Sequence, residues 1–138
     1  MKFNDEIPVY GDVTFRGNCS LESADQRAFV SYLRAKHPRT YGAIVVHNRN
    51  EGKRSFQQAA RFKADGMTKG ASDIMIPANP PFVCEMKRKD HTKSAWKKGQ
   101  QEYLLSCKEL GAFSCLALGV DGAIAAFEDY LYKLKNKP

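Results

Sequence analysis

The stretch KGASDIMIPANPPFVCEMK, residues 69–87, decides how the chain is expected to fold. It contains two short apolar runs, Ser72–Ile76 and Pro81–Lys87, in which β-branched, aromatic and other apolar side chains are typical of strands. Residues 77–80 between them read Pro-Ala-Asn-Pro, a composition typical of turns. The stretch therefore predicts a β-hairpin with a proline-bounded turn.

Charged side chains interrupt this apolar hairpin. Asp73 lies near the start of the first strand, and Glu85 and Lys87 lie near the end of the second. Side chains two residues apart on a strand share a face, so Glu85 and Lys87 point to the same side as Val83. The intervening residues point into the other layer: Phe82, Cys84 and Met86. The turn is expected to bring Asp73 close to this polar face.

Two neighbouring carboxylates repel each other unless a proton or a cation joins them. A few hard oxygen ligands suit Mg²⁺ or Mn²⁺, which keep waters for a substrate. Such an ion polarises a phosphate and lowers the pKa of bound water, and a nearby lysine orients the attacking hydroxide or stabilises developing charge. Asp73, Glu85 and Lys87 thus point to phosphodiester hydrolysis, although Glu-x-Lys alone is common and a purely structural role stays open.

The rest of the chain alternates helical and extended patterns. Expected helices span Ser20–Lys36, Ser55–Ala64, Ser94–Leu110 and Asp121–Leu134, and further strands span Ala43–Val46 and Phe113–Leu118. Ser20, or Ser23 with Gln26, caps the first helix, and the choice decides whether Glu22 lies in its first turn. The order α-β-α-β-β-α-β-α describes an α/β fold, a mixed sheet with helices packed on it.

Length and composition fit one globular domain. The chain has 138 residues, 43% of them hydrophobic, and we assign residues 21–134 to the domain. Residues 1–20 form an acidic arm without periodicity and residues 135–138 a basic tail, and both ends are expected to be loose.

Several classes of protein are excluded by local patterns. No apolar run reaches the roughly 20 residues that cross a bilayer, and residues 1–10 lack the features of a secretory signal. We therefore expect a cytoplasmic protein. The cysteines show no spacing typical of zinc sites and are expected to be free thiols: Cys19, Cys84, Cys107 and Cys115.

Positive charge is concentrated in two zones of a chain whose net charge is +7. Residues 47–69 and 87–98 are rich in lysine and arginine, whereas residues 1–25 carry an excess of acids. Clustered bases favour a polyanion such as DNA, although a merely solvated face is the alternative. Candidate DNA-binding residues are Arg49, Lys53, Arg54, Lys69, Lys93, Trp96, Lys97 and Lys98.

An ordered set of short motifs resembles a known family. Gly70-x-x-Asp73, Glu85-x-Lys87, Gln100-x-x-Tyr103 and then Gly111 look like the VRR-NUC branch of the PD-(D/E)XK nucleases. The resemblance covers residues 21–120. Two features depart from the family pattern: Ser72 stands where the family often has proline, and the segment from Lys87 to Gln100 is long and basic.

The resemblance assigns a role to each matching position. It implies that Asp73 and Glu85 ligate Mg²⁺ or Mn²⁺, that Lys87 is the catalytic base or orients the water, and that Gln100 lies in the active site. It also implies a further acid from the first helix, for which Glu22 is the best candidate. Asp25, one turn away, is the alternative in a different register.

The resemblance further implies a restriction-endonuclease-like fold and a metal-dependent endodeoxyribonuclease without an organic cofactor. Stand-alone, phage-type members are small homodimers that cut branched DNA such as four-way junctions, and a phage-encoded chain would act in the host cytoplasm. Two alternatives stay open: a general DNA-degrading or nicking nuclease, and a non-catalytic nucleic-acid-binding module.

Overall fold

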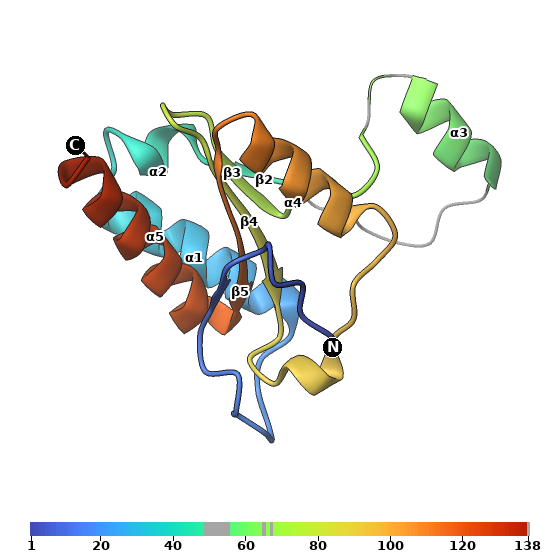
Figure 1. Ribbon diagram of the computed structural model, residues 1–138, viewed down its shortest axis with the longest axis horizontal. Coiled ribbons are helices and arrows are strands. Elements are labelled where there is room, and N and C mark those ends of the chain that lie inside the picture. The colour runs from blue at the N-terminus through green and yellow to red at the C-terminus, as the bar shows by residue number, and fades with distance from the viewer. Residues whose placement is uncertain (49–55, 65, 67, 138) are drawn as a thin grey trace.

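The hairpin expected from residues 69–87 lies at the centre of the fold, a computed structural model that describes residues 1–48, 56–64, 66 and 68–137 (Figure 1). Strands β3 (Ile74–Ile76) and β4 (Phe82–Lys87) pair antiparallel, with Ile74 opposite Cys84. This register continues so that Asp73, directly before β3, lies near Glu85 of β4. The predicted hairpin is confirmed, and its turn ends in a cis Asn79–Pro80 bond.

Five strands form one mixed sheet in the order β1-β5-β4-β3-β2. β5 (Phe113–Leu118) runs parallel to β4, and its bounds are those predicted. The sheet is extended at its two edges by very short strands, β1 (Val9–Tyr10) beside β5 and β2 (Val46–His47) beside β3. The α/β class and the mixed sheet flanked by helices are confirmed.

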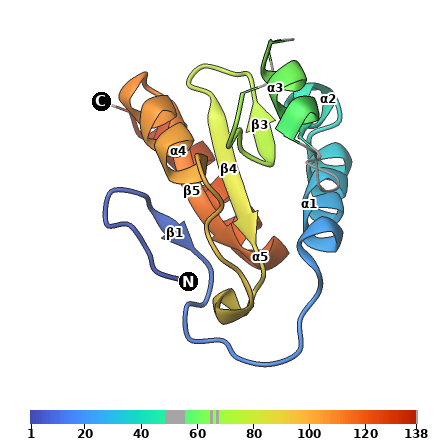
Figure 2. The same cartoon turned by 90° about the vertical axis from the view of Figure 1, so that its right-hand side faces the viewer.

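Helices cover both faces of the sheet (Figure 2). α1 (Glu22–Lys36) and α5 (Gly119–Lys135) pack on one face, where their apolar residues meet the side chains of Phe82, Cys84 and Met86. α4 (Gln100–Glu109) packs on the other face through Leu104, which meets Val83 and Leu116. The alternation predicted for β4 is therefore confirmed, with packing residues on one side and Val83, Glu85 and Lys87 on the other.

Two predicted elements differ at their ends. The helix expected from Ser94 begins only at Gln100, because Gly99 adopts a left-handed φ of 93° that a helix cannot contain. A 3₁₀ turn, η1 (His91–Lys93), precedes this segment. The last helix begins at Gly119, so Asp121 lies in its first turn and does not cap it.

The segment before β2 is helical where a strand was expected. The prediction of a strand over Ala43–Val46 is wrong: α2 (Tyr41–Ile44) forms a single helical turn and β2 begins at Val46. Gly42 lies so close to the end of α1 that a Cβ there would stand 2.4 Å from the Leu33 carbonyl oxygen. The turn itself is formed by backbone hydrogen bonds from the Gly42 N–H to the His37 carbonyl at 2.8 Å and from the Val45 N–H to the Tyr41 carbonyl at 3.0 Å.

The acidic arm is an ordered part of the structure, and the expectation that it is loose is wrong. Val9 and Tyr10 form β1, and Ile7 is 3% exposed within the cluster around Leu104. The Tyr10 hydroxyl donates a hydrogen bond of 2.5 Å to Asp129 of α5. The arm is therefore attached to the sheet and to the last helix.

α3 (Phe56–Ala64) confirms the helix predicted for this part of the chain and stands away from the packed layers (Figure 1). All four cysteines are free, and Cys84 and Cys115 are buried. No helix among the described residues is both long and apolar enough to span a membrane.

Candidate functional site

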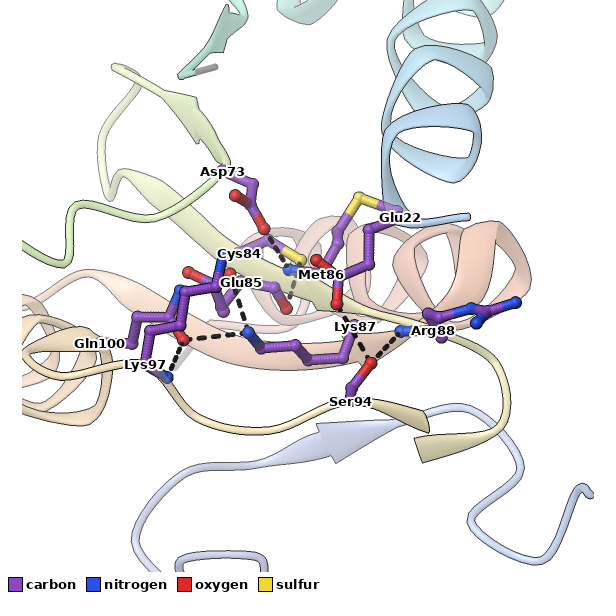
Figure 3. Close-up of polar contacts among 10 residues, drawn as sticks. All are labelled: Glu22, Asp73, Cys84, Glu85, Met86, Lys87, Arg88, Ser94, Lys97 and Gln100. Atoms are coloured by element: carbon purple, nitrogen blue, oxygen red, sulfur yellow. Dashed lines mark hydrogen bonds and ion pairs between the residues drawn. The ribbon is translucent and has the colours of Figure 1, made fainter. Parts of the chain in front are cut away.

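A cavity of about 370 Å³ lies where the amino end of α1, the sheet and the amino end of α4 meet. Every residue that lines it except Leu21 has a polar side chain; the lining residues are Leu21, Glu22, Ser23, Gln26, Asn48, Asp73, Glu85, Arg88, Lys97 and Gln100. Residues from distant parts of the sequence therefore meet in one place. Asp73, Glu85, Gln100 and Glu22, singled out from the sequence, all face it, and Lys87 lies directly beside it (Figure 3).

Two carboxylates at the base of this cavity are almost fully buried. Asp73 is 8% exposed and Glu85 is 1% exposed. Asp73 Oδ2 accepts a hydrogen bond of 3.0 Å from the backbone N–H of Met86, which fixes its orientation. Within the described part of the chain, Glu85 Oε1 is buried without any hydrogen-bond partner. An orphaned carboxylate oxygen in the interior is costly and indicates a ligand.

The pKa of Glu85 is raised well above its ordinary value. Burial is the main cause, and the adjacent carboxyl group of Asp73 adds to it, while Lys87 acts in the opposite direction. Ionisation of Glu85 is therefore less favourable in the folded, metal-free protein than it is in water. A divalent cation bound by the two carboxylates would oppose this shift, because its positive charge favours their ionised forms.

Lys87 is buried and held from two sides. Its Nζ donates a hydrogen bond of 3.0 Å to Gln100 Oε1 and lies 3.9 Å from Glu85 Oε2. The same Gln100 oxygen accepts a hydrogen bond of 2.8 Å from the backbone N–H of Lys97. Gln100 thus fixes the ammonium group of Lys87 beside the carboxylate pair.

Two glycines bring the start of α4 close to the segment before Asp73. Gly70 has a left-handed φ of 79°, and a Cβ there would lie 2.3 Å from the carbonyl carbon and oxygen of Gly99. The same Cβ would lie 2.8 Å from the backbone nitrogen of Gln100. The glycine of the Gly-x-x-Asp motif therefore has a physical reason: it lets Gln100 approach Lys87.

Glu22 reaches the cavity from the first turn of α1, whose N-cap is Leu21, so neither Ser20 nor Ser23 caps the helix. Its Oε1 accepts a hydrogen bond of 3.0 Å from the Ser94 hydroxyl. The described residues contain no set of three His, Cys, Asp or Glu side chains close enough to hold one metal ion. Glu22 therefore shares the cavity with Asp73 and Glu85 without joining them in a preformed three-acid cluster.

Asp25, the alternative acid on α1, faces elsewhere. It lines a separate cavity of about 260 Å³ beside Lys89, Val120 and Asp121 at the start of α5. Burial raises the pKa of its carboxyl group. The geometry thus favours Glu22 over Asp25 as the helix-borne acid of the candidate site.

The predicted DNA-binding residues fall into three groups. Lys97 lines the cavity, and Lys69 and Lys98 are exposed. Lys93 and Trp96 contact the amino-terminal arm: Lys93 Nζ donates to the Gly17 carbonyl at 2.8 Å and Trp96 Nε1 donates to the Lys2 carbonyl at 2.8 Å. Arg49, Lys53 and Arg54 lie outside the described residues.

Several polar residues of the cavity were not predicted. Asn48 donates from its backbone N–H to the Asp73 carbonyl at 2.8 Å and from its side chain to the Ser72 carbonyl at 2.9 Å. Gln26 Oε1 lies 2.8 Å from His47 Nε2. The one sequence signal for the role of Asn48 was its position as a polar residue directly after a strand.

The donor set fits a divalent metal ion. Asp73 and Glu85 supply hard oxygen atoms, one of them orphaned and buried, and the cavity leaves room for waters and a substrate oxygen. Lys87 already has two partners, so the atom that still lacks a partner is the buried carboxylate oxygen of Glu85.

The fold and site together define the class of protein: a mixed α/β sheet with a carboxylate pair and a lysine on its central hairpin. A solved structure titled "VRR_NUC domain protein" has this fold, with a TM-score of 0.66 and 19% sequence identity. The match covers 83% of this chain and 91% of that chain. It confirms, at the level of fold, the resemblance drawn from the sequence motifs. No family model and no curated protein matches the sequence.

Proposed function

We propose that the protein is a metal-dependent endonuclease that hydrolyses phosphodiester bonds in DNA. One observation carries the proposal. The buried Glu85 oxygen without a partner lies beside Asp73, and Lys87 is fixed next to this pair by Gln100. The likeness in fold to the VRR_NUC domain protein supports the proposal independently of this geometry.

Asp73 and Glu85 would hold Mg²⁺ or Mn²⁺, and Glu22 would add an acid from the far side of the cavity. When bound, the ion supplies a Lewis acid for the phosphate oxygen and lowers the pKa of a bound water. The orientation of Asp73 by the Met86 N–H would keep one carboxylate in place before the ion arrives.

Lys87 would orient the attacking water. Its ammonium group cannot turn away, because Gln100 Oε1 accepts from it at 3.0 Å and the side chain is 1% exposed. A fixed donor at this position stabilises charge that develops on the phosphate without reorganisation at the moment of reaction. The water oxygen would form the new bond to phosphorus, the bond to the leaving oxygen would break, and a proton would finally rest on that oxygen.

DNA would reach the cavity along its basic rim. Arg88 and Lys97 line the cavity, and the exposed Lys98 lies next to it in the sequence. Cationic side chains around an acidic centre guide a phosphate backbone to ligands that would otherwise repel it. Arg88 is fixed because its guanidinium donates to the carbonyls of Cys19 and Ser20, at 2.8 and 3.2 Å.

We further propose that the substrate is branched DNA, such as a four-way junction, and that the enzyme acts as a homodimer. The resemblance to stand-alone, phage-type nucleases motivates this choice. Symmetric incision of a junction needs two active sites, and each chain offers one candidate site, so a two-fold dimer is the simplest arrangement.

Cleavage of end-labelled DNA in Mg²⁺, in Mn²⁺ and in chelator tests the nuclease proposal. Lys87→Ala should lower the cleavage rate by about 10²- to 10⁴-fold, the range expected for a positioned proton-transfer or water-orienting group. Lys135→Ala is the matched control, because Lys135 is an exposed lysine on α5.

Full activity of Lys87→Ala would contradict the proposal. Binding without any product in either metal, with a strong salt dependence, would instead favour a non-catalytic nucleic-acid-binding module.

A further inference from the structure

Ser94 stands between the end of β4 and the acid on α1 (Figure 3). Its Oγ accepts a hydrogen bond of 3.0 Å from the backbone N–H of Arg88 and donates one of 3.0 Å to Glu22 Oε1. Arg88 directly follows Lys87 in the sequence. One hydroxyl group therefore connects the strand that carries Glu85 and Lys87 with the carboxylate of Glu22.

The position of Ser94 is fixed by its surroundings. The η1 turn before it is capped by Asp90, whose Oδ1 accepts from Thr92 N–H at 3.0 Å. Asp90 Oδ2 accepts from Gly17 N–H at 3.0 Å, and the Ser94 N–H donates to the His91 carbonyl at 3.1 Å. The hydroxyl is thus held relative to β4 by its own short segment and does not depend on Glu22 for its place.

Glu22 needs such a fixed partner. A glutamate in the first turn of a helix can adopt several rotamers, and most of them would leave the cavity. The Ser94 bond occupies Oε1, whereas Oε2 accepts no hydrogen bond from any described residue. One oxygen is therefore anchored and the other is available on the cavity side.

We infer that Ser94 is a positioning residue that orients Glu22 for metal binding. The inference rests on the proposed function, because it assigns Glu22 to the metal-dependent site. Hydrogen bonds to ligating carboxylates orient them, and their loss typically lowers metal affinity or activity by about 10- to 100-fold. Neither the motifs nor the likeness in fold assigns a role to Ser94.

Mn²⁺ binding to the full chain, measured by calorimetry without DNA, tests this role. Ser94→Ala should weaken Mn²⁺ binding about tenfold or more and raise the Mn²⁺ concentration at half-maximal cleavage by a similar factor. Ser94→Thr should restore both, because the extended backbone of Ser94, with φ −127° and ψ 164°, accommodates a β-branched residue with the same hydroxyl. Ser31→Ala, an exposed serine on α1, is the control.

A double-mutant cycle separates positioning from a structural role. If Ser94 acts through Glu22, the double variant with Glu22→Gln binds Mn²⁺ no more weakly than Glu22→Gln alone. Additive losses would overturn the inference, and so would wild-type Mn²⁺ affinity in Ser94→Ala. Wild-type affinity in Glu22→Gln overturns it even if Ser94→Ala does not fold.

The two proposals fail in distinguishable ways. A wild-type chain that neither binds Mn²⁺ nor cuts DNA removes the proposed function and this inference together. A wild-type chain that does both, with Ser94→Ala unchanged, removes the inference alone.

Discussion

The carboxyl group of Glu85 lies in the protein interior beside Asp73, and its ionisation opposes folding of the metal-free chain. Its pKa is raised in the folded state, chiefly by burial, from an ordinary value of 4.5. The folded state therefore binds a proton more tightly than the unfolded state. The stability linked to this group is fully present below about pH 4.5 and is lost as the pH rises through the folded-state pKa.

Glu85→Gln should therefore raise the melting temperature of the metal-free protein at neutral pH by a few degrees. The gain should become small near pH 4, where Glu85 is mostly protonated in both states. Thermal unfolding in chelator between pH 4 and pH 8 measures it, with Glu109→Gln, an exposed glutamate at the end of α4, as the control. If Glu85→Gln is less stable than the wild-type protein at pH 7.5, the prediction is wrong, and the ionised Glu85 stabilises the folded chain through its neighbours.

Single residues differed in how well the sequence predicted them. Asp73 and Glu85 could be placed together because hairpin pairing and strand alternation are local rules. The sequence did not predict that Lys93 and Trp96 bind carbonyls of Gly17 and Lys2, more than 70 residues away, and their contact with DNA stays a prediction. Long-range hydrogen bonds of this kind leave no local pattern, and the same holds for Ser94 with Glu22.

At the scale of helices and strands, the close packing of the start of α4 against the segment before β3 depends on Gly70. Gly70→Ala should lower stability by about 1–3 kcal/mol or more, because the left-handed backbone is strained by a Cβ and the added carbon meets Gly99 at 2.3 Å. Relief of this clash would displace Gln100 from Lys87. We therefore also expect a loss of cleavage of about tenfold or more.

Gly111→Ala is the matched comparison for this prediction. Gly111 also has a left-handed φ, of 99°, but no described atom lies within 4 Å of the added Cβ. Gly111→Ala should lower the free energy of unfolding by about 1–2 kcal/mol, the cost of a left-handed backbone for alanine. Cleavage by the folded variant should be unchanged. Equal losses of activity and melting temperature in the two variants would show that the Gly70 contact does not position Gln100.

Elements with a clear pattern were predicted well. The hairpin and β5 carry continuous apolar runs between turn residues, and the structure confirms their bounds to within one or two residues. β1 and β2 have two residues each, too few for any periodicity, and are strands only because neighbouring strands bind them. The start of α4 was missed because the left-handed conformation of Gly99 depends on packing against residues 69–70.

In the molecule as a whole, the sequence predicted the core but not the position of the amino-terminal arm. The α/β class followed from the order of helical and extended patterns. The acidic residues 1–20 were expected to be loose, yet Lys93 binds the Gly17 carbonyl and Lys108 the Glu6 carbonyl, at 2.8 and 2.7 Å. These lysines donate hydrogen bonds to backbone oxygens of the arm. Net charge alone does not predict such contacts.

The junction proposal predicts a two-fold dimer in solution. Light scattering coupled to size-exclusion chromatography at working concentration should give about twice the chain mass of 15.5 kDa. The reason is geometric, because two symmetric incisions need two copies of the Asp73, Glu85 and Lys87 site. A monomer at every concentration that supports cleavage would count against paired incision and would favour a nicking or general nuclease.

The most direct test compares a labelled four-way junction with a linear duplex of the same sequence, in Mg²⁺, in Mn²⁺ and in chelator. We expect paired, metal-dependent incisions in the junction, an intact linear duplex, and loss of both incisions in Lys87→Ala. Equal digestion of the linear duplex would keep the nuclease and remove its selectivity. A junction that is bound but never cut, or one cut equally well by Lys87→Ala, would contradict catalysis at this site.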